Sequence, residues 1–224
     1  MAPALIDAIN ANDVERVVEL LEEGEDPNEV WKDEYKVVRT PLFEAVGSPP
    51  SSTSQEEVEA SLDAVVVLLR RGAIVNEKDE ERALSPLLGA INHHNIACAR
   101  ILLAAGADPN IHGDQGETPL RLCAEYGNHE MARLLLRCSA DVYQWGGSDG
   151  MNALGYAAAM LDVEMVRLFL AHGADPNVLD LDRDTVFKHV RHFPYRSMPE
   201  TPEKWERLRE ICRLLGAPEP TPRP

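Results

Sequence analysis

Two sequence landmarks recur at a spacing close to 33 residues, and this period constrains the fold more than any other feature. The first landmark is a helix-start motif of a small polar residue followed by Pro, Ala or Val and an apolar residue, with copies that begin at Thr40, Ser85, Thr118, Asn152 and Thr185. The second is a residue suited to positive φ after a paired apolar helix end, with copies at Gly24, Gly72, Gly106, Ser139, Gly173 and Gly216. Two independent landmarks that share one period predict a stack of helix pairs.

The most regular copy of this unit runs from 104 to 136. Thr118 can cap a first helix with its hydroxyl, and Pro119 suits the first helical position, where no backbone donor is needed. A break at Gly127 precedes a second helix, whose predicted apolar face comprises Met131, Leu134, Leu135 and Cys138. Helices this short are marginal alone, so each pair needs neighbours on both sides.

The chain resembles the ankyrin repeat family over roughly residues 3–217. The motifs that carry the resemblance are GADPN at 106–110 and 173–177, TPL at 40–42 and 118–120, and YGNHEMARLLL at 126–136. The resemblance implies an all-α ankyrin-repeat solenoid of about six helix-turn-helix units, with short β-like fingers and a concave groove that binds proteins.

We therefore expect a single ankyrin repeat domain over residues 1–217 and a disordered tail at 218–224. The expected units are 3–28, 38–76, 83–110, 116–142, 150–177 and 183–217, with insertions at 47–61 and 192–201. In the first insertion, a Pro/Ser-rich loop is followed by Ser54 and Glu57 at capping-box spacing, which predicts a long helix from Gln55 to Arg71. This loop could contact a partner or be a tolerated surface excursion.

One position departs from the family pattern. The residue after the helix-start motif is often His in ankyrin repeats, where it links neighbouring repeats by hydrogen bonds. Here the position holds Phe43, Leu88, Arg121, Gly155 and Lys188. We therefore expect a thinner polar network between repeats, more reliance on apolar stacking, and an array that opens first at its ends.

Composition and motifs argue against several classes of protein. The sequence has no apolar run of about 18 residues, and its first residues lack the basic and apolar regions of a secretory signal. The four cysteines lack metal-finger spacing and are predicted to be reduced packing residues, which favours a cytoplasmic location. No phosphate-binding loop or hydrolase motif is present, so we expect no enzyme activity, no cofactor and no metal site.

Charge is uneven along the chain. The formal net charge is −16, and residues 1–80 hold 19 acidic but only 7 basic residues. Nucleic acid is an unfavourable ligand for such a surface, because its binding relies on neutralising phosphates with Lys and Arg. A protein partner with a basic patch, steered by charge, is favoured, and the alternative is that the charge serves solubility alone.

Candidate contact residues lie on the fingers and at the ends of the first helices. Trp145 is the strongest candidate, because a finger tip is poorly placed for core burial and Trp is enriched in interface hot spots. Trp31 and Tyr35 are either contact anchors or residues that pack on the adjacent finger. The complete candidate set is Trp31, Tyr35, Asp114, Gln115, Tyr126, Trp145, Met160, Leu179 and Leu181.

These observations together predict a non-catalytic protein-binding module of the cytoplasm that is monomeric when free and binds neither nucleic acid nor membrane. One specific form is an inhibitor or immunity-type neutraliser of a basic protein. The alternative is an adaptor that links a client protein to a larger assembly.

Overall fold

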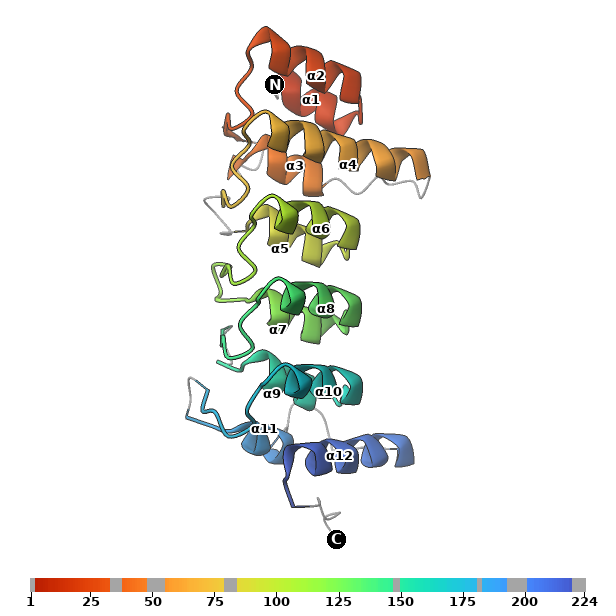
Figure 1. Ribbon diagram of the computed structural model, residues 1–224, viewed down its shortest axis with the longest axis vertical. Helices are drawn as coiled ribbons and strands as arrows, with labels where there is room; N and C mark the ends of the chain where they lie inside the picture. The colour runs from red at the N-terminus through yellow and green to blue at the C-terminus, as the bar shows by residue number, and fades with distance from the viewer. Residues whose placement is uncertain are drawn as a thin grey trace. The chain divides into compact units, whose positions relative to one another are not determined.

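The structure is a computed structural model that describes residues 3–32, 38–47, 55–78, 84–146, 150–180, 183–192 and 201–218. The chain divides into two compact units, 1–114 and 115–224, and each unit is described by itself. Both units are built from consecutive pairs of short helices, as the repeat period predicts (Figure 1). The expectation of one domain over 1–217 stays a prediction.

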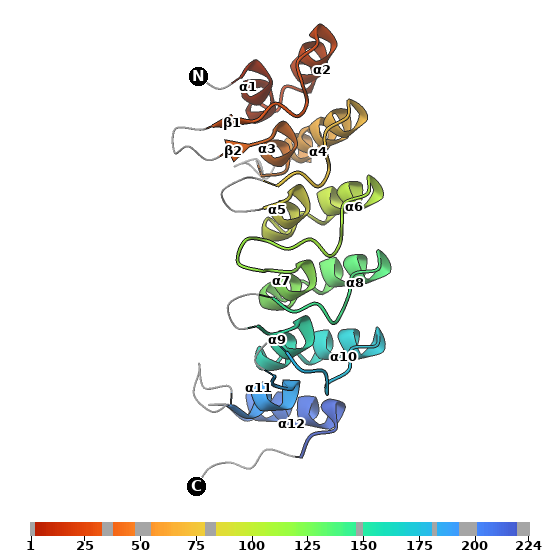
Figure 2. The same ribbon diagram turned by 90° about the vertical axis from the view of Figure 1, so that its left-hand side faces the viewer.

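The first unit holds three helix pairs and one β-hairpin. In this unit, α1 packs on α3 and α3 on α5, while α2 packs on α4 and α4 on α6. The two short strands are antiparallel, with Trp31 opposite Arg39 (Figure 2). The elements are α1 (Ala4–Asn10), α2 (Val14–Glu23), β1 (Trp31–Lys32), β2 (Val38–Arg39), α3 (Pro41–Gly47), α4 (Gln55–Arg70), α5 (Pro86–Asn92) and α6 (Ile96–Ala104).

The second unit repeats this arrangement. Here α7, α9 and α11 form one row of contacts and α8, α10 and α12 form the other. The elements are α7 (Pro119–Tyr126), α8 (His129–Arg137), α9 (Ala153–Ala159), α10 (Val163–Ala171), α11 (Val186–His192) and α12 (Pro202–Leu215).

Helix starts follow the predicted capping chemistry. The Thr118 hydroxyl accepts from the Arg121 amide at 3.3 Å, and the Asn152 side chain accepts from the Gly155 amide at 2.8 Å. Helix α4 confirms the long helix expected after the insertion, while Ser54 of the proposed capping box lies outside the described residues.

Helix ends confirm the second landmark. All six marked residues have positive φ, including Ser139 at 66°. Gly24 is representative, with φ of 104° at the end of α2. A left-handed residue there lets the chain leave the helix while its amides still bond the last carbonyls, and glycine adopts this conformation at least cost.

Cys138 is a correction to the predicted core. Met131, Leu134 and Leu135 are buried, but Cys138 is exposed, because it is the C-cap of α8 and lies beyond the last turn that faces the core. Cys98 is buried as expected, and its burial raises the pKa of the thiol to about 12.

Thiol labelling tests this assignment of the cysteines. In the native protein at about pH 8, a maleimide should modify Cys138 rapidly, because this thiol is exposed to solvent. Cys98, Cys123 and Cys212 are buried and should react only after denaturant is added. Peptide mass spectrometry identifies the labelled site; rapid native labelling of Cys98 or Cys123 would contradict the packing.

Several hydrogen bonds between repeats lie in the turns after the second helices, which the sequence did not reveal. The Asn76 side chain donates to the Gly106 carbonyl at 3.3 Å and accepts from the Asp108 amide at 2.9 Å. Asn28 makes the same pair of bonds one repeat earlier, to the Gly72 carbonyl and from the Ile74 amide. In the second unit, the Tyr143 hydroxyl donates to the Gly173 carbonyl. The expectation of a thinner polar network thus overlooked these turns.

Replacing Asn76 with Ala should destabilise the first unit by about 1–2 kcal/mol, because two hydrogen bonds between repeats are lost at an exposed site. The Asp108 amide, which donates to Asn76, should also exchange faster with solvent. Asn177→Ala is a matched control, since within the described residues Asn177 bonds only Asp175 of its own turn. Equal urea-unfolding effects for the two variants would contradict a special role for the inter-repeat bonds.

Candidate functional site

The first unit carries three of the predicted contact residues. Trp31 is half-buried in β1, and its indole nitrogen is shielded from solvent without an acceptor among the described residues. Asp114 is exposed, and Tyr35 lies outside the described residues. Trp31 therefore combines packing with a polar group that has no partner, and its role in binding stays a prediction.

Trp145 lies on a finger of the second unit whose backbone makes close contacts with neighbouring segments. The side chain is 46% exposed, and the residue forms a β-bridge with Asn152. Gly146 is buried, and its amide donates to the Met151 carbonyl at 3.4 Å. A Cβ atom at Gly146 would lie 1.7 Å from the backbone oxygen of Gly116. Glycine is needed there for close backbone approach, and Gly147 lies outside the described residues.

Gly146→Ala should destabilise the second unit by about 1–3 kcal/mol or more, because backbone rather than a flexible side chain must move to admit the methyl group. It should also shift the NMR signal of the Trp145 indole N–H. Gly47→Ala serves as a control, since the nearest atom to an added Cβ there, Nε2 of His93, is 4.0 Å away. An unperturbed indole signal in Gly146→Ala would argue against this finger geometry.

Two other predicted residues meet at one hollow. Tyr126 ends α7 and Met160 follows α9, and their side chains are 42% and 45% exposed. We call this the α7–α9 hollow; its volume is about 530 Å³. Its lining consists of Ala124, Glu125, Tyr126, Gly127, His129, Met160, Leu161, Asp162, Val163, Glu164 and Arg207.

A buried cation lies beside this hollow. The Arg121 guanidinium stacks over the Tyr156 ring at 4.7 Å from its centre, and Nη1 donates to Glu125 at 3.4 Å. Arg121 occupies the position where ankyrin repeats often have His, and it links α7 to α9. Partial burial, followed by the carboxylates of Glu125 and Glu117, raises the pKa of Tyr126. The Tyr126 phenol is therefore protonated at neutral pH and lies in a locally negative field.

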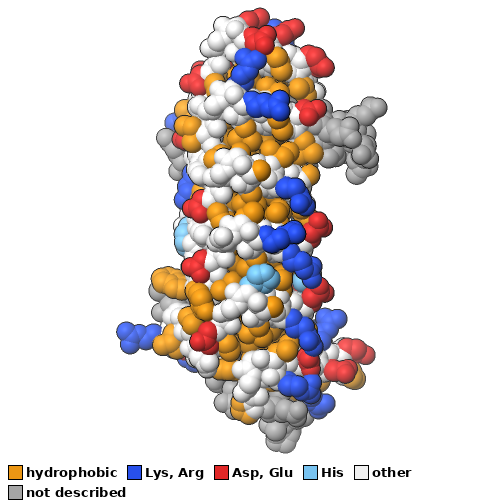
Figure 3. Space-filling view, in the orientation of Figure 1, with side chains coloured by type: hydrophobic (Ala, Val, Ile, Leu, Met, Phe, Trp, Pro, Cys, Tyr) orange, Lys and Arg blue, Asp and Glu red, His pale blue; other side chains and the backbone are white. Residues whose placement is uncertain are grey.

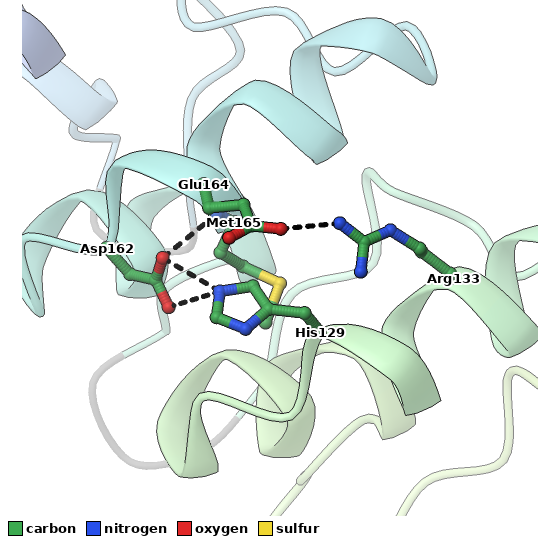
Figure 4. Close-up of polar contacts among 5 residues, drawn as sticks. All are labelled: His129, Arg133, Asp162, Glu164 and Met165. Carbon is green, nitrogen blue, oxygen red and sulfur yellow. Dashed lines mark hydrogen bonds and ion pairs between the residues drawn. The ribbon is translucent and has the colours of Figure 1, made fainter.

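Figure 4 shows polar contacts between α8 and the start of α10, which we call the α8–α10 clasp; His129, Asp162 and Glu164 of this clasp line the hollow. His129 Nε2 lies 2.9 Å from Asp162 Oδ2, and Asp162 Oδ1 also accepts from the Met165 amide at 3.0 Å. Arg133 donates to Glu164 at 2.6 Å. Asp162 thus caps α10 while it binds the first residue of α8. This clasp was missed, although His129 and Asp162 are 33 residues apart and occupy adjacent positions in successive repeats.

The remaining candidates are more scattered. Gln115 is exposed, Leu179 is 52% exposed on the next finger, and Leu181 lies outside the described residues. Among the described members of the predicted set, the structure therefore brings only Tyr126 and Met160 to a common hollow. Figure 3 shows acidic and basic side chains mixed along one edge over α8, α10 and α12, where Arg167 pairs with Glu210.

The described part of the chain contains no cluster of three or more His, Cys, Asp or Glu residues placed to hold a metal. Within the same residues, no helix is both long and apolar enough to cross a bilayer.

Comparison with known proteins identifies the repeat. A family model described as ankyrin repeats (3 copies) matches residues 53–144 and 87–180. An ankyrin repeat-containing protein of Treponema pallidum (strain Nichols) is 36% identical over 127 residues, which is 57% of this chain and 42% of that protein. An ankyrin repeat protein of Rickettsia bellii (strain RML369-C) is 43% identical over 54 residues, which is 24% of this chain and 32% of the relative.

A more distant relative extends over more of this chain. The mitochondrial disaggregase of Bos taurus is 29% identical over 177 residues, which is 76% of this chain and 24% of that protein. The chain thus spans less than half the length of each of these relatives.

Proposed function

This chain belongs to the ankyrin repeat family, and we propose that it is a non-catalytic module that inhibits or neutralises a basic protein partner. Ankyrin repeats are in general protein–protein interaction modules. The observation that carries the proposal is a set of large apolar side chains left exposed on the fingers and helix ends of the second unit. These are Tyr126, Tyr143, Trp145, Met160 and Leu179, each at least 42% exposed.

Such exposure supports binding because aromatic and methionine side chains are enriched at protein interfaces. Trp145 forms a β-bridge with Asn152, and Tyr126 and Met160 lie at the ends of α7 and α9, so these three side chains project from defined segments. A preformed surface loses less conformational entropy on binding than a flexible one. The surface is therefore suited to one specific protein partner.

The acidic charge supports a basic partner. Residues 1–80 contribute 19 acidic and 7 basic residues, which produces a negative field over that part of the chain. Such a field accelerates encounter with a positively charged protein and disfavours nucleic acid. The proposal accordingly describes a cytoplasmic monomer that pairs with one basic protein.

A second candidate function is an adaptor. The support for it is that the chain spans less than half of each relative named above, so repeats of this kind occur within larger proteins. An adaptor engages two partners at once, whereas an inhibitor forms one tight pair.

Affinity capture from the native lysate, followed by mass spectrometry, separates these functions. The proposal predicts one stoichiometric basic protein whose activity falls on binding. Several sub-stoichiometric partners in one complex would favour the adaptor, and recovery of nucleic acid alone would contradict both. The association rate with a captured basic partner should also fall as salt rises from low to physiological concentration.

Trp145→Ala should weaken binding of the captured partner by about 2 kcal/mol or more if this exposed ring is a hot spot. Arg137→Ala is the matched control, because Arg137 is also exposed but lies at the end of a second helix, away from the fingers. Calorimetry measures both affinities. An unchanged affinity for Trp145→Ala would remove Trp145 from the binding surface.

A further inference from the structure

The α7–α9 hollow offers a surface that suits a cation better than an alkyl group. Its exposed floor includes the ring of Tyr126 and the thioether of Met160. The face of an aromatic ring carries negative electrostatic potential, and guanidinium groups stack on it more readily than ammonium groups do. Thioether sulfur is polarisable and adapts to a guest of irregular shape.

The carboxylates of the hollow differ in how strongly they are already engaged. Asp162 is held by His129 and by the Met165 amide, and Glu164 accepts a short bond from Arg133. The bond from Arg121 to Glu125 is longer, at 3.4 Å. Charge-assisted bonds of this kind prefer about 2.7–2.9 Å, and a carboxylate can accept from several donors. Glu125, next to Tyr126 in sequence, therefore has the capacity to accept from a further cation.

The protein already contains a guanidinium in this kind of environment. Arg121 is stacked on Tyr156 at 4.7 Å while it donates to Glu125. A guest guanidinium on Tyr126 would use the same carboxylate from the solvent side and the same type of ring surface. The internal contact shows that this combination of groups can hold a guanidinium in this fold.

Opposing charge restricts how a guest can enter. Arg207 of α12 also lines the hollow, and the nearby cations Arg121 and Arg133 are paired with Glu125 and Glu164. A cationic group is therefore favoured near Tyr126 and Glu125 and is repelled by Arg207. The hollow therefore favours a side chain whose charged end lies next to Glu125 and Tyr126 of α7.

We propose that the α7–α9 hollow receives an arginine side chain of the protein partner, with its guanidinium stacked on Tyr126 and donating to Glu125. This inference rests on the proposed function, in which the partner presents a basic surface. The volume of about 530 Å³ is large enough to admit an arginine side chain.

The methyl group of Met160 provides a direct test with the full chain and a small probe. N-acetyl-argininamide is titrated into protein labelled with ¹³C at the methionine methyl groups, and N-acetyl-citrullinamide, which has a similar shape without the charge, is titrated in parallel. We expect a saturable shift of the Met160 signal with the arginine probe and at least about threefold weaker binding of the citrulline probe. Equal binding of both probes, or no shift at Met160, would overturn the proposal.

Variants locate the probe within the hollow. Glu125→Gln and Tyr126→Leu should each weaken binding of the arginine probe about threefold to fivefold, as expected for loss of a solvent-exposed cation contact. Arg207→Gln should strengthen it. Glu130→Gln is the matched control for Glu125→Gln, because Glu130 is an exposed glutamate of α8 that does not line the hollow. Unchanged binding in Glu125→Gln, or weaker binding in Arg207→Gln, would contradict the assignment.

Folding of each variant is checked in the same spectra. Met131 and Met165 are fully buried, so their methyl signals should stay in place if the core is intact. If the protein captures a basic partner but the Met160 signal does not shift with the arginine probe, the proposed function is supported and the arginine site is ruled out. If the protein binds the arginine probe but captures no partner, the arginine site is supported and the proposed function is ruled out.

Discussion

A pair of helices of eight and nine residues cannot bury its apolar faces by itself, and every other feature of each unit depends on the contact that one pair makes with the next. Leu135 of α8 and Leu87 of α5 are fully buried although their helices span only about two turns. That burial requires a neighbouring helix pair in the same unit, which α10 supplies for α8 and α3 supplies for α5. The repeat period is therefore a condition for folding as well as a sequence pattern.

Apolar stacking alone does not fix how one helix pair is placed on the next. Hydrogen bonds between corresponding turns fix that placement. A left-handed residue ends each second helix, and side chains such as Asn76 then bond the corresponding turn of the next repeat. In the second unit, the close approach of Gly146 to Gly116 holds the finger that presents Trp145. These contacts hold the repeats together without using the exposed face of Trp145, so that face can contact a partner. This separation of scaffold from contact surface is the physical basis of the proposed binding function.

Local rules explain why most of the fold could be predicted from the sequence. A helix start needs a side-chain cap such as Thr118, and a helix end needs a left-handed residue such as Gly106; both requirements concern only a few consecutive residues. Cys138 was misplaced because the apolar period continues one position beyond the last helical turn. The steric constraint on Gly146 could not be predicted, because it comes from Gly116, which lies 30 positions earlier in the chain.

The candidate site could be predicted only in part for a related reason. Tyr126 and Met160 stood out as apolar residues at the ends of first helices, and they do share a hollow. The clasp between His129 and Asp162 and the stacking of Arg121 on Tyr156 depend on the register between repeats. The register between repeats cannot be predicted from the identities of single residues. Partner identity depends on surface shape and charge, which no repeat motif encodes.

Native-state hydrogen exchange of Leu135→Ala tests most directly whether contacts between repeats hold the fold. Leu135 is fully buried in α8, and its truncation should cost about 2–5 kcal/mol. If the pairs depend on one another, the slowest amides of α7, α9 and α10 should lose protection by similar free energies, although none of these helices carries the substitution. Faster exchange confined to α8 would show that the pairs are stable separately and would contradict this account.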